Sequence, residues 1–295
     1  DEPAMAEILA LQVARFRRGP FVLDYVGTYA EGLRRLLSGD YALCLLDYNL
    51  GERNGLELLR EAKAAHCPTP VILLTGSSKA ETDMAAMDSG AADFLEKNEL
   101  TLHGLERAVC YAIEMAEAMS RLQDLATHDN LTGAKNRREF DRRLQEEWVR
   151  SQRFQRPLAV MMLDLDRFKA INDTHGHPVG DEVLRQAADV LAGQIRQVDC
   201  LARYGGDEFA LILVETNRSN ALATGQRLHA QLAANPCRSA RKSLTLPIEA
   251  SGGVAAWPED AATLADLVAA ADVALYEAKR QGRYRIVSAG GAAVE

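Results

Sequence analysis

The sequence predicts an α/β domain and an α+β domain joined by a long helix, and three observations support this prediction. The chain has 295 residues, 47% hydrophobic and 26% charged, a length and composition typical of two soluble globular domains. Strand-like and helix-like segments alternate in both halves of the chain. Between the halves, residues 101–126 contain no proline and, after Gly104, no glycine.

The first domain is expected over residues 1–120, with a parallel sheet covered by helices on both faces. Its strand-like runs are apolar throughout, as buried parallel strands are. The expected helices are residues 5–18, 29–37, 56–65 and 81–89, and the expected strands are residues 21–26, 41–46, 71–74 and 92–95. This alternation indicates a doubly wound fold.

The segment 101–126 is expected to form a helical stalk. Its apolar or small residues fall in steps of three and four, at positions 102, 105, 109, 112, 116, 119 and 126. This is a heptad pattern of about three repeats, which is enough for a paired stalk. The alternative is a last helix packed on the sheet of its own domain. We favour that alternative for the first half of the segment and the paired stalk for the second half.

The second domain is expected over residues 127–290. Strands 201–204 and 209–214 are joined across Gly205 and Gly206, a pair that suits a tight hairpin. The other expected strands are residues 158–163 and 284–287, with a strand or hairpin over 243–254, and the expected helices are residues 179–195, 219–234 and 263–280. Strand hairpins mixed with helices indicate an α+β domain.

Charge and cysteine content exclude several classes of protein. The net charge is −8 and the pI about 5.4, which argues against a basic DNA-binding face. The five cysteines are scattered without a C-x-x-C pair, as in a reduced cytosolic protein without a zinc site. There is no apolar run of membrane-spanning length and no signal peptide. We therefore expect a cytoplasmic protein that binds neither nucleic acid nor a membrane.

Three polar residues follow strand ends in the first domain: Asp47, Thr75 and Lys97. The carboxyl ends of parallel strands share one sheet edge, where ligands bind. An aspartate, a hydroxyl and an ammonium there suit a phosphoryl acceptor. The alternative, three unrelated polar loop starts, is the weaker interpretation because all three fall at strand ends.

The segments LLDYNLGERNGLELL, VILLTG and GAADFLEK resemble the receiver domains of two-component systems over nearly all of residues 1–120. The resemblance implies a flavodoxin-like fold that a histidine kinase phosphorylates. It assigns Asp47 as the phosphorylation site, Thr75 as the switch hydroxyl, Phe94 as the switch aromatic, Lys97 as the phosphate partner and the Asn49 carbonyl as a Mg²⁺ ligand.

Two departures from the receiver pattern stand out. Lys97 is followed by Asn98, where proline is usual. The chain begins at Asp1-Glu2-Pro3, which resembles the end of the acidic pocket and makes Asp1 one acidic ligand. We therefore expect the first strand and a further acidic ligand to lie upstream of residue 1.

Carboxylates also gather in the second domain. Asp164 ends a buried strand, and Asp207 and Glu208 follow the Gly-Gly turn. Aspartates that meet at one sheet end form an oxygen-rich cage for Mg²⁺. Lys279 and Arg283 lie four residues apart near a helix end, a spacing that suits phosphate binding. An ordinary turn beside an edge carboxylate is the alternative.

Four ordered motifs are similar to the GGDEF family of diguanylate cyclases over residues 126–287. They begin at His128 (HDNLTGAKNRR), Asp164 (DLDRFKAINDTHGHPVGD), Arg203 (RYGGDEF) and Ala274 (ALYEAKRQGR). The resemblance implies a nucleotidyl-cyclase or palm-like domain with a mostly antiparallel sheet. It departs at Tyr284, where asparagine is commoner, and at Gly252, where a β-branched residue is usual; both are expected to loosen local packing.

The resemblance also implies site residues. Mg²⁺ or Mn²⁺ would be held by Asp164, Asp207 and the Leu165 carbonyl. Phosphates would meet the amides of Arg167, Phe168 and Lys169 and the charges of Lys169, Lys279 and Arg283. Asn172 and Asp181 would read guanine, which favours GTP over ATP. Asp207, Glu208 and Lys169 would be catalytic, with Glu208 supporting the metal or the incoming hydroxyl.

The implied reaction joins two GTP into cyclic di-GMP and releases two pyrophosphates. Because each domain holds one GTP, a homodimer is required. Arg196 and Asp199 match an R-x-x-D site for inhibition by the product. A degenerate domain that only binds nucleotide is disfavoured by the intact GGDEF sequence. A transcription factor would need a basic helix-turn-helix after residue 120, which the sequence lacks.

Overall fold

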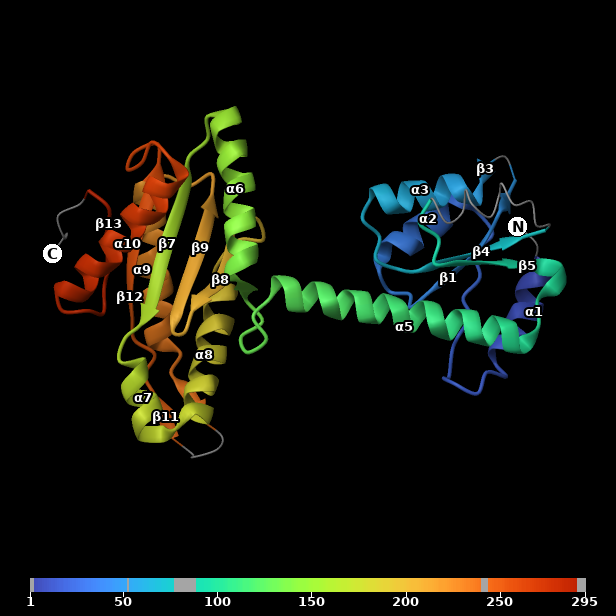
Figure 1. The fold of residues 1–295 in the computed structure, drawn as a ribbon, viewed down its shortest axis with the longest axis horizontal. Helices are drawn as coiled ribbons and strands as arrows, with labels where there is room; N and C mark the ends of the chain where they lie inside the picture. The colour runs from blue at the N-terminus through green and yellow to red at the C-terminus, as the bar shows by residue number, and fades with distance from the viewer. Residues whose placement is uncertain (1–2, 52, 77–88, 240–243, 291–295) are drawn as a thin grey trace. The chain divides into compact units, whose positions relative to one another are not determined.

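The computed structural model describes residues 3–51, 53–76, 89–239 and 244–290 (Figure 1). The chain divides into two compact units between Leu122 and Gln123, inside the segment that the sequence predicts to be a stalk. Asp1, a predicted acidic ligand, and the expected helix 81–89 lie outside the described residues, apart from position 89. Each unit is described by itself.

The first unit is built on a parallel sheet in the order β1-β4-β5. Its strands are β1 (Cys44–Asp47), β4 (Val71–Thr75) and β5 (Asp93–Glu96). All five residues of the central strand β4 are buried. The register places Asp47 opposite Leu74, and Thr75 opposite Glu96. The ends of β1 and β4 that carry Asp47 and Thr75 therefore lie at the same edge, as the sequence predicts.

Helices cover both faces of this sheet, which confirms the doubly wound fold. On one face, α1 (Pro3–Val13) and the start of α5 (Leu102–Thr127) pack over Ile72 and Leu74. On the other face, α2 (Tyr29–Ser38) and α3 (Gly55–Ala64) pack over Leu46 and Leu73. A short ribbon of β2 (Asn49–Leu50) and β3 (Arg53–Asn54) precedes α3, and the 3-10 turn η1 (Lys97–Glu99) follows β5.

Two expectations for the first unit are wrong. Residues 21–26 do not form a strand: Val22 is 95% exposed, and only the side chains of Phe21 and Leu23 join the apolar cluster. An apolar run becomes a strand only where a neighbouring strand completes its hydrogen bonds. Helix α1 ends at Val13 instead of residue 18: the N–H groups of Arg15 and Phe16 donate to carbonyls three residues back, and those of Arg17 and Arg18 donate to Glu106 Oε1 at 2.5 and 3.1 Å.

Helix α5 has two parts with different surroundings. Leu105, Val109 and Ala112 are buried against the sheet of the first unit, which confirms the packing that we favour for the first half. The second half keeps large apolar side chains exposed. Those that are more than half exposed from Tyr111 onward are Tyr111, Met115, Met119, Leu122 and Leu125. We call Met115, Met119, Leu122 and Leu125 the stalk stripe.

The second unit contains a six-stranded sheet in the order β13-β12-β7-β9-β8-β6. The strands are β6 (Lys135–Asn136), β7 (Leu158–Leu165), β8 (Cys200–Gly205), β9 (Glu208–Val214), β12 (Ala250–Trp257) and β13 (Ile286–Ser288). The three central pairings are antiparallel, and the two edge strands pair in parallel. A mostly antiparallel sheet is confirmed.

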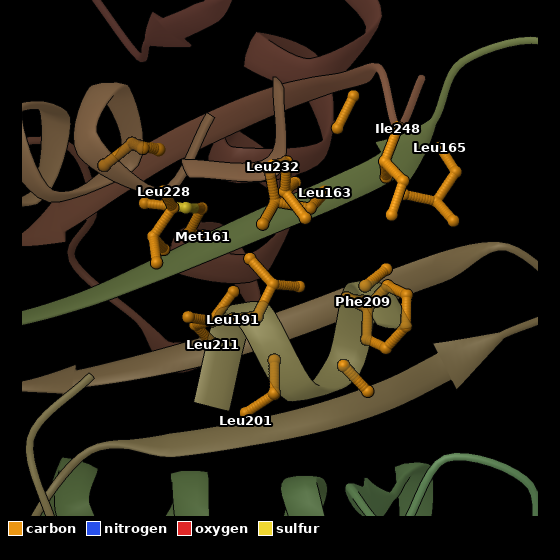
Figure 2. Packing of buried hydrophobic residues seen from close by; sticks show 14 of the residues in the cluster. Met161, Leu163, Leu165, Leu191, Leu201, Phe209, Leu211, Leu228, Leu232 and Ile248 are labelled. Atoms are coloured by element: carbon orange, nitrogen blue, oxygen red, sulfur yellow. The ribbon is translucent and has the colours of Figure 1, made fainter. Parts of the chain in front are cut away.

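The side chains of β7 alternate between two apolar layers. Met161 and Leu163 pack with α8 (His177–Ala192) and α9 (Arg218–Ala234) on one face, and Figure 2 shows this layer. Val160 and Met162 pack with α6 (Arg137–Phe154) and α10 (Leu264–Arg280) on the other. Helix α7 (Phe168–His175) follows β7, and β10 (Cys237–Ser239) pairs with β11 (Leu244–Leu246).

The two departures from the GGDEF pattern do not loosen the packing. A Cβ atom at Gly252 would lie 2.6 Å from Leu163 Cδ2 and 2.7 Å from Ile286 Cδ1, so these side chains already fill the space. The ring of Tyr284 contacts the ring of His229, with centroids 4.3 Å apart.

Within the described residues, none of the helices combines the length and the apolar character needed to cross a bilayer.

Candidate active site

Three acidic residues, Asp164, Asp207 and Glu208, lie at one end of the large sheet. Strand β7 ends on Asp164 and Leu165, and β9 begins on Glu208, which lies directly opposite Asp164 in the antiparallel register. The Leu165 N–H donates to the Asp207 carbonyl at 3.1 Å. The structure therefore brings Asp207 beside Asp164 and Leu165, which lie more than 40 residues earlier in the sequence, as the sequence predicts.

The charges at this end are not balanced. The Asp164 side chain is 13% exposed, and burial raises its pKa; Asp207 and Glu208 raise it further, while Lys279, 2.7 Å away, lowers it. Lys279 is the cation that the structure places against this carboxylate. A divalent cation fits here because it would relieve the excess negative charge.

The protein supplies only some of the ligands that a divalent cation needs at this site. Among the residues that the structure describes, no three His, Cys, Asp or Glu side chains gather closely enough to cage a metal. Two carboxylates and a backbone carbonyl would leave coordination positions for phosphate oxygens and water. That arrangement is usual for Mg²⁺, which is often held by one or two carboxylates together with substrate phosphates.

A turn beside the carboxylates presents backbone amides. Arg167 precedes helix α7 with φ of 58°, a left-handed conformation that is uncommon for a residue with a side chain. The amides of Phe168 and Lys169 form the first turn of the helix, where N–H groups have no partner within the helix. Such a turn attracts anions, and the side chains of Arg167 and Lys169 are exposed beside it.

Asn172 presents a buried acceptor that lacks a donor. Its Oδ1 atom is buried and has no hydrogen-bond partner among the described residues. The half-buried Asp181 follows Gly180 in helix α8. A Cβ atom at Gly180 would lie 1.9 Å from Asn172 Oδ1, so only glycine leaves room for this amide. Acceptors on neighbouring helices suit a ligand edge that carries N–H donors.

Gly180 was not among the residues predicted from the sequence. A glycine in the first turns of a predicted helix was the available signal, because glycine there usually has a packing or functional reason.

Arg283 is exposed and follows α10, and its Nε lies 3.9 Å from Asp166 Oδ1. Lys279 and Arg283 therefore both reach toward the β7 end of the sheet.

Arg203 holds the turn that carries Asp207. Its Nε and Nη2 atoms donate to the Gly206 carbonyl at 3.0 and 2.7 Å, and its Nη1 contacts both oxygens of Asp129 at 3.1 and 3.2 Å. The Asp129 side chain is 24% exposed. This brace was not predicted from the sequence, although Arg203 and Asp129 both lie inside the motifs that carry the family resemblance.

Arg196 and Asp199, the residues of the R-x-x-D match, form an ion pair. Arg196 Nε donates to Asp199 Oδ2 at 3.1 Å, and its Nη2 also donates to the Val214 carbonyl and to Thr216 Oγ1. Asp199 is buried, with its side chain 3% exposed, and accepts from the Val214 N–H. The Arg196 side chain is 59% exposed. A buried carboxylate thus anchors an arginine that faces solvent.

The first unit brings together two of its predicted site residues and places a third beside them. Lys97 Nζ donates to Asp47 Oδ2 at 2.7 Å, and both side chains are largely buried. Thr75 is 2% exposed, and its Oγ1 has no hydrogen-bond partner among the described residues. An added phosphoryl oxygen would satisfy that hydroxyl. The Asn49 N–H donates to Asp47 Oδ1 at 3.2 Å, and Phe94 is half-buried in the apolar cluster under α2 and α3.

Two family models match the chain. The model described as "Diguanylate cyclase, GGDEF domain" matches residues 126–285, more than half of the chain. The model described as "Response regulator receiver domain" matches residues 1–108. The two matches correspond to the two structural units.

Curated relatives resemble somewhat more than half of the chain. The chain is 38% identical over 177 residues to the bifunctional diguanylate cyclase/cyclic di-GMP phosphodiesterase MucR of Pseudomonas aeruginosa, covering 60% of this chain and 25% of that protein. It is 37% identical over 164 residues to the response regulator PleD of Caulobacter vibrioides, covering 56% of this chain and 36% of that protein. The chain therefore spans only a quarter to about a third of the length of these relatives.

Solved structures support the fold of the second unit. The GGDEF domain of TpbB from Pseudomonas aeruginosa is 39% identical with a TM-score of 0.53, covering 55% of this chain and 94% of that one. The GGDEF domain of DgcB from Caulobacter crescentus, solved in complex with c-di-GMP, is 32% identical with a TM-score of 0.54, covering 56% of this chain and 97% of that one. The chain belongs to the GGDEF family, with a response regulator receiver domain ahead of its GGDEF domain.

Proposed function

We propose that this protein is a diguanylate cyclase that condenses two GTP into cyclic di-GMP under the control of its receiver domain. One observation carries the proposal: a buried acceptor without a donor, an amide turn and a carboxylate pair belong to segments that follow directly after β7 or lie beside its end in the GGDEF unit. Each of the three parts suits one part of GTP: the base, the triphosphate and the metal that accompanies it.

The base is recognised by acceptors. Asn172 Oδ1 is buried without a donor, and Asp181 lies one residue beyond the glycine against which that amide packs. The Watson–Crick edge of guanine offers N1–H and N2–H₂, which would satisfy both residues. Adenine lacks this donor pair, and each buried acceptor left unpaired costs about 1–3 kcal/mol. GTP is therefore the expected substrate.

The triphosphate is bound by the α7 turn and by cations. The amides of Phe168 and Lys169 face the phosphates, and Lys169, Lys279 and Arg283 balance their charge. Asp164, Asp207 and the Leu165 carbonyl would hold Mg²⁺ or Mn²⁺. A cation held there would supply Lewis-acid chemistry, neutralising phosphate charge and making the attacking 3′-hydroxyl more acidic. Glu208, which lies opposite Asp164 in the sheet, supports the metal site or the incoming hydroxyl.

Two chains are needed for one reaction. Each GGDEF domain holds one GTP, so the 3′-hydroxyl of one must face the α-phosphate of the other. The stalk stripe supplies a means of pairing, because its apolar residues are exposed at spacings of three and four. We propose that phosphorylation of Asp47 by a histidine kinase draws Thr75 inward and moves Phe94, and that this change favours the paired stalk.

Product inhibition is proposed at Arg196 and Asp199. The exposed guanidinium, held by a buried carboxylate, offers directed donors to a phosphate or guanine edge of cyclic di-GMP. Binding there would limit the amount of product at high concentration.

The test is product analysis with a matched pair of variants. Incubation with GTP and Mg²⁺ followed by chromatography should yield cyclic di-GMP, whereas ATP should yield no cyclic product. Asp207→Asn should abolish product formation, and Asp173→Asn, a change at an exposed carboxylate of α7, should leave it unchanged. If the wild-type protein binds GTP but forms no cyclic dinucleotide, the domain is a nucleotide-binding module and the proposal is wrong.

A further inference from the structure

One buried carboxylate near the site has no part in the function proposed above. Asp166 lies two residues after Asp164 and is 6% exposed. Ser251 Oγ, which is fully buried, donates toward both Asp166 oxygens at 3.0 and 2.8 Å. The Tyr284 N–H donates to Asp166 Oδ2 at 3.1 Å. These donors turn the carboxylate toward strand β12 and the segment after α10, so it is already occupied by protein donors.

The segment that Asp166 holds is strained. Arg283 and Tyr284 have φ of 62° and 52°, so two successive residues with side chains adopt the left-handed conformation. Tyrosine tolerates this region less readily than asparagine or glycine, so the conformation costs free energy. Such strain persists only where surrounding contacts enforce it. Here the enforcing contacts are the bonds from the Tyr284 N–H to Asp166 Oδ2 and to Ser251 Oγ, the latter at 3.0 Å.

The strained backbone determines where the Arg283 side chain begins. Arg283 N–H donates to the Ala278 carbonyl at 3.0 Å, which ties the residue to the end of α10. On the other side, Tyr284 is tied to Asp166, and Arg283 Nε itself lies 3.9 Å from Asp166 Oδ1. The arginine is thus held between the end of α10 and the turn that follows β7. Its side chain is 57% exposed, so the guanidinium remains available to a ligand.

We propose that Asp166, with Ser251, is a positioning residue that holds the Arg283–Tyr284 backbone so that Arg283 can bind the phosphates of GTP. The inference rests on the proposed function, because it takes Arg283 as a phosphate-binding residue. Asp166 itself touches neither the nucleotide nor the cation. Its loss frees the backbone at Tyr284 to leave the left-handed region, and the guanidinium then moves away from the phosphates.

The test is a double-mutant cycle on the full chain. The dissociation constant of a non-hydrolysable GTP analogue is measured by calorimetry for wild type, Arg283→Ala, Asp166→Ala and the double variant. Arg283→Ala should weaken binding about tenfold, equivalent to about 1.4 kcal/mol. Asp166→Ala should weaken it by a similar factor, and the double variant should be no weaker than Arg283→Ala alone, because both changes remove the same contact.

Conservative and control variants separate positioning from stability. Asp166→Asn keeps an acceptor for the Tyr284 N–H and should retain most of the affinity. Asp173→Ala removes an exposed carboxylate of α7 and should change neither affinity nor melting temperature. The kinetic constants of Asp166→Ala distinguish loss of positioning from partial unfolding. Loss of positioning should raise the KM for GTP by a larger factor than it lowers kcat, whereas a partly unfolded sample would lose kcat at constant KM.

The outcomes are distinct. Losses that add in the double variant, or a lowered melting temperature with unchanged affinity in Asp166→Ala, would overturn the positioning role. If wild type binds the analogue and Arg283→Ala binds it equally well, Arg283 is not a phosphate ligand and the inference is wrong, while GTP binding stands. If wild type binds no analogue, the proposed function itself has failed.

Discussion

The ammonium group of Lys279 lies 2.7 Å from Asp164 Oδ2, which joins the end of α10 to the end of β7. This ion pair does not fully compensate the carboxylate, because burial still raises the pKa of Asp164. A carboxyl whose pKa is higher in the folded state binds protons more tightly there than in the unfolded chain. Its ionisation therefore destabilises the fold as the pH rises from the unfolded pKa through the folded one.

Asp164→Asn should consequently abolish cyclase activity without lowering stability. Asparagine cannot ionise, so the variant escapes the loss of stability that wild type undergoes as pH rises through that window. Thermal unfolding in EDTA between pH 4 and pH 8 measures the effect, and the variant should melt at or above the wild-type temperature at neutral pH. A clearly lower melting temperature there would show that the Lys279 pair outweighs the cost of burial.

Gly180→Ala should impair nucleotide binding. The added methyl group would overlap Asn172 Oδ1, so the amide must move away from the position in which it faces the ligand. We expect the KM for GTP to rise about tenfold or more, which corresponds to the loss of one hydrogen bond of about 1.5 kcal/mol. Gly193→Ala is the control, because its Cβ would make only ordinary contacts at 3.4 Å or more. Equal KM values for the two variants would contradict the role of Asn172.

The stalk stripe should control dimerisation. Leu122 is 61% exposed, and Leu122→Glu would place two charges at the paired surface. Burial of a leucine side chain contributes about 1.5–3 kcal/mol, so the dimer dissociation constant should rise at least tenfold. Sedimentation velocity and the dependence of specific activity on protein concentration measure this. Ser120→Glu, an exposed position outside the stripe, is the control. Unchanged mass and activity in Leu122→Glu would exclude the stripe as the pairing surface.

Arg196→Ala should raise the amount of product formed before the reaction stops, with little change in initial rate. The exposed guanidinium provides the proposed product contact, and in the variant the buried Asp199 carboxylate keeps its hydrogen bonds from the N–H groups of residue 196 and Val214. Asp199→Ala should act differently: Asp199 is buried and accepts from Val214 N–H and Arg196, so the variant should also lose about 1–3 kcal/mol of stability. The hypothesis fails if added cyclic di-GMP inhibits wild type and Arg196→Ala at the same concentration.

Phosphorylation of Asp47 should activate the enzyme. The Asp47 carboxylate and the Lys97 ammonium are 2.7 Å apart, and the buried Thr75 hydroxyl lacks a partner among the described residues. A beryllofluoride phosphate mimic should therefore raise both specific activity and apparent mass, and Asp47→Asn should remove both effects. Equal activity and equal mass with and without the mimic, below the dimer dissociation constant, would refute receiver-driven dimerisation.

Sequence patterns predicted most of the helices and strands in segments where apolar residues recur at regular spacing. Strand β7, for example, was expected over residues 158–163 and extends over Leu158–Leu165. The prediction failed for residues 21–26, because an apolar run does not by itself show whether a partner strand is present. It also failed at the end of α1, where the Arg17 and Arg18 amides donate to Glu106, a residue almost 90 positions away.

The sequence by itself determined the family, the two domains and the residue types at the ends of the strands, because these depend on local spacing and on motifs. Only the tertiary structure decided which neighbours complete each group. Gly180 makes room for Asn172, Arg203 joins Asp129 to the Gly206 carbonyl, and Asp166 turns away from the carboxylates to hold Tyr284. Apart from the local bond between Arg203 and the Gly206 carbonyl, these contacts join residues from 8 to 118 positions apart, and their geometry follows from the packing of helices on the sheet, which local sequence does not encode.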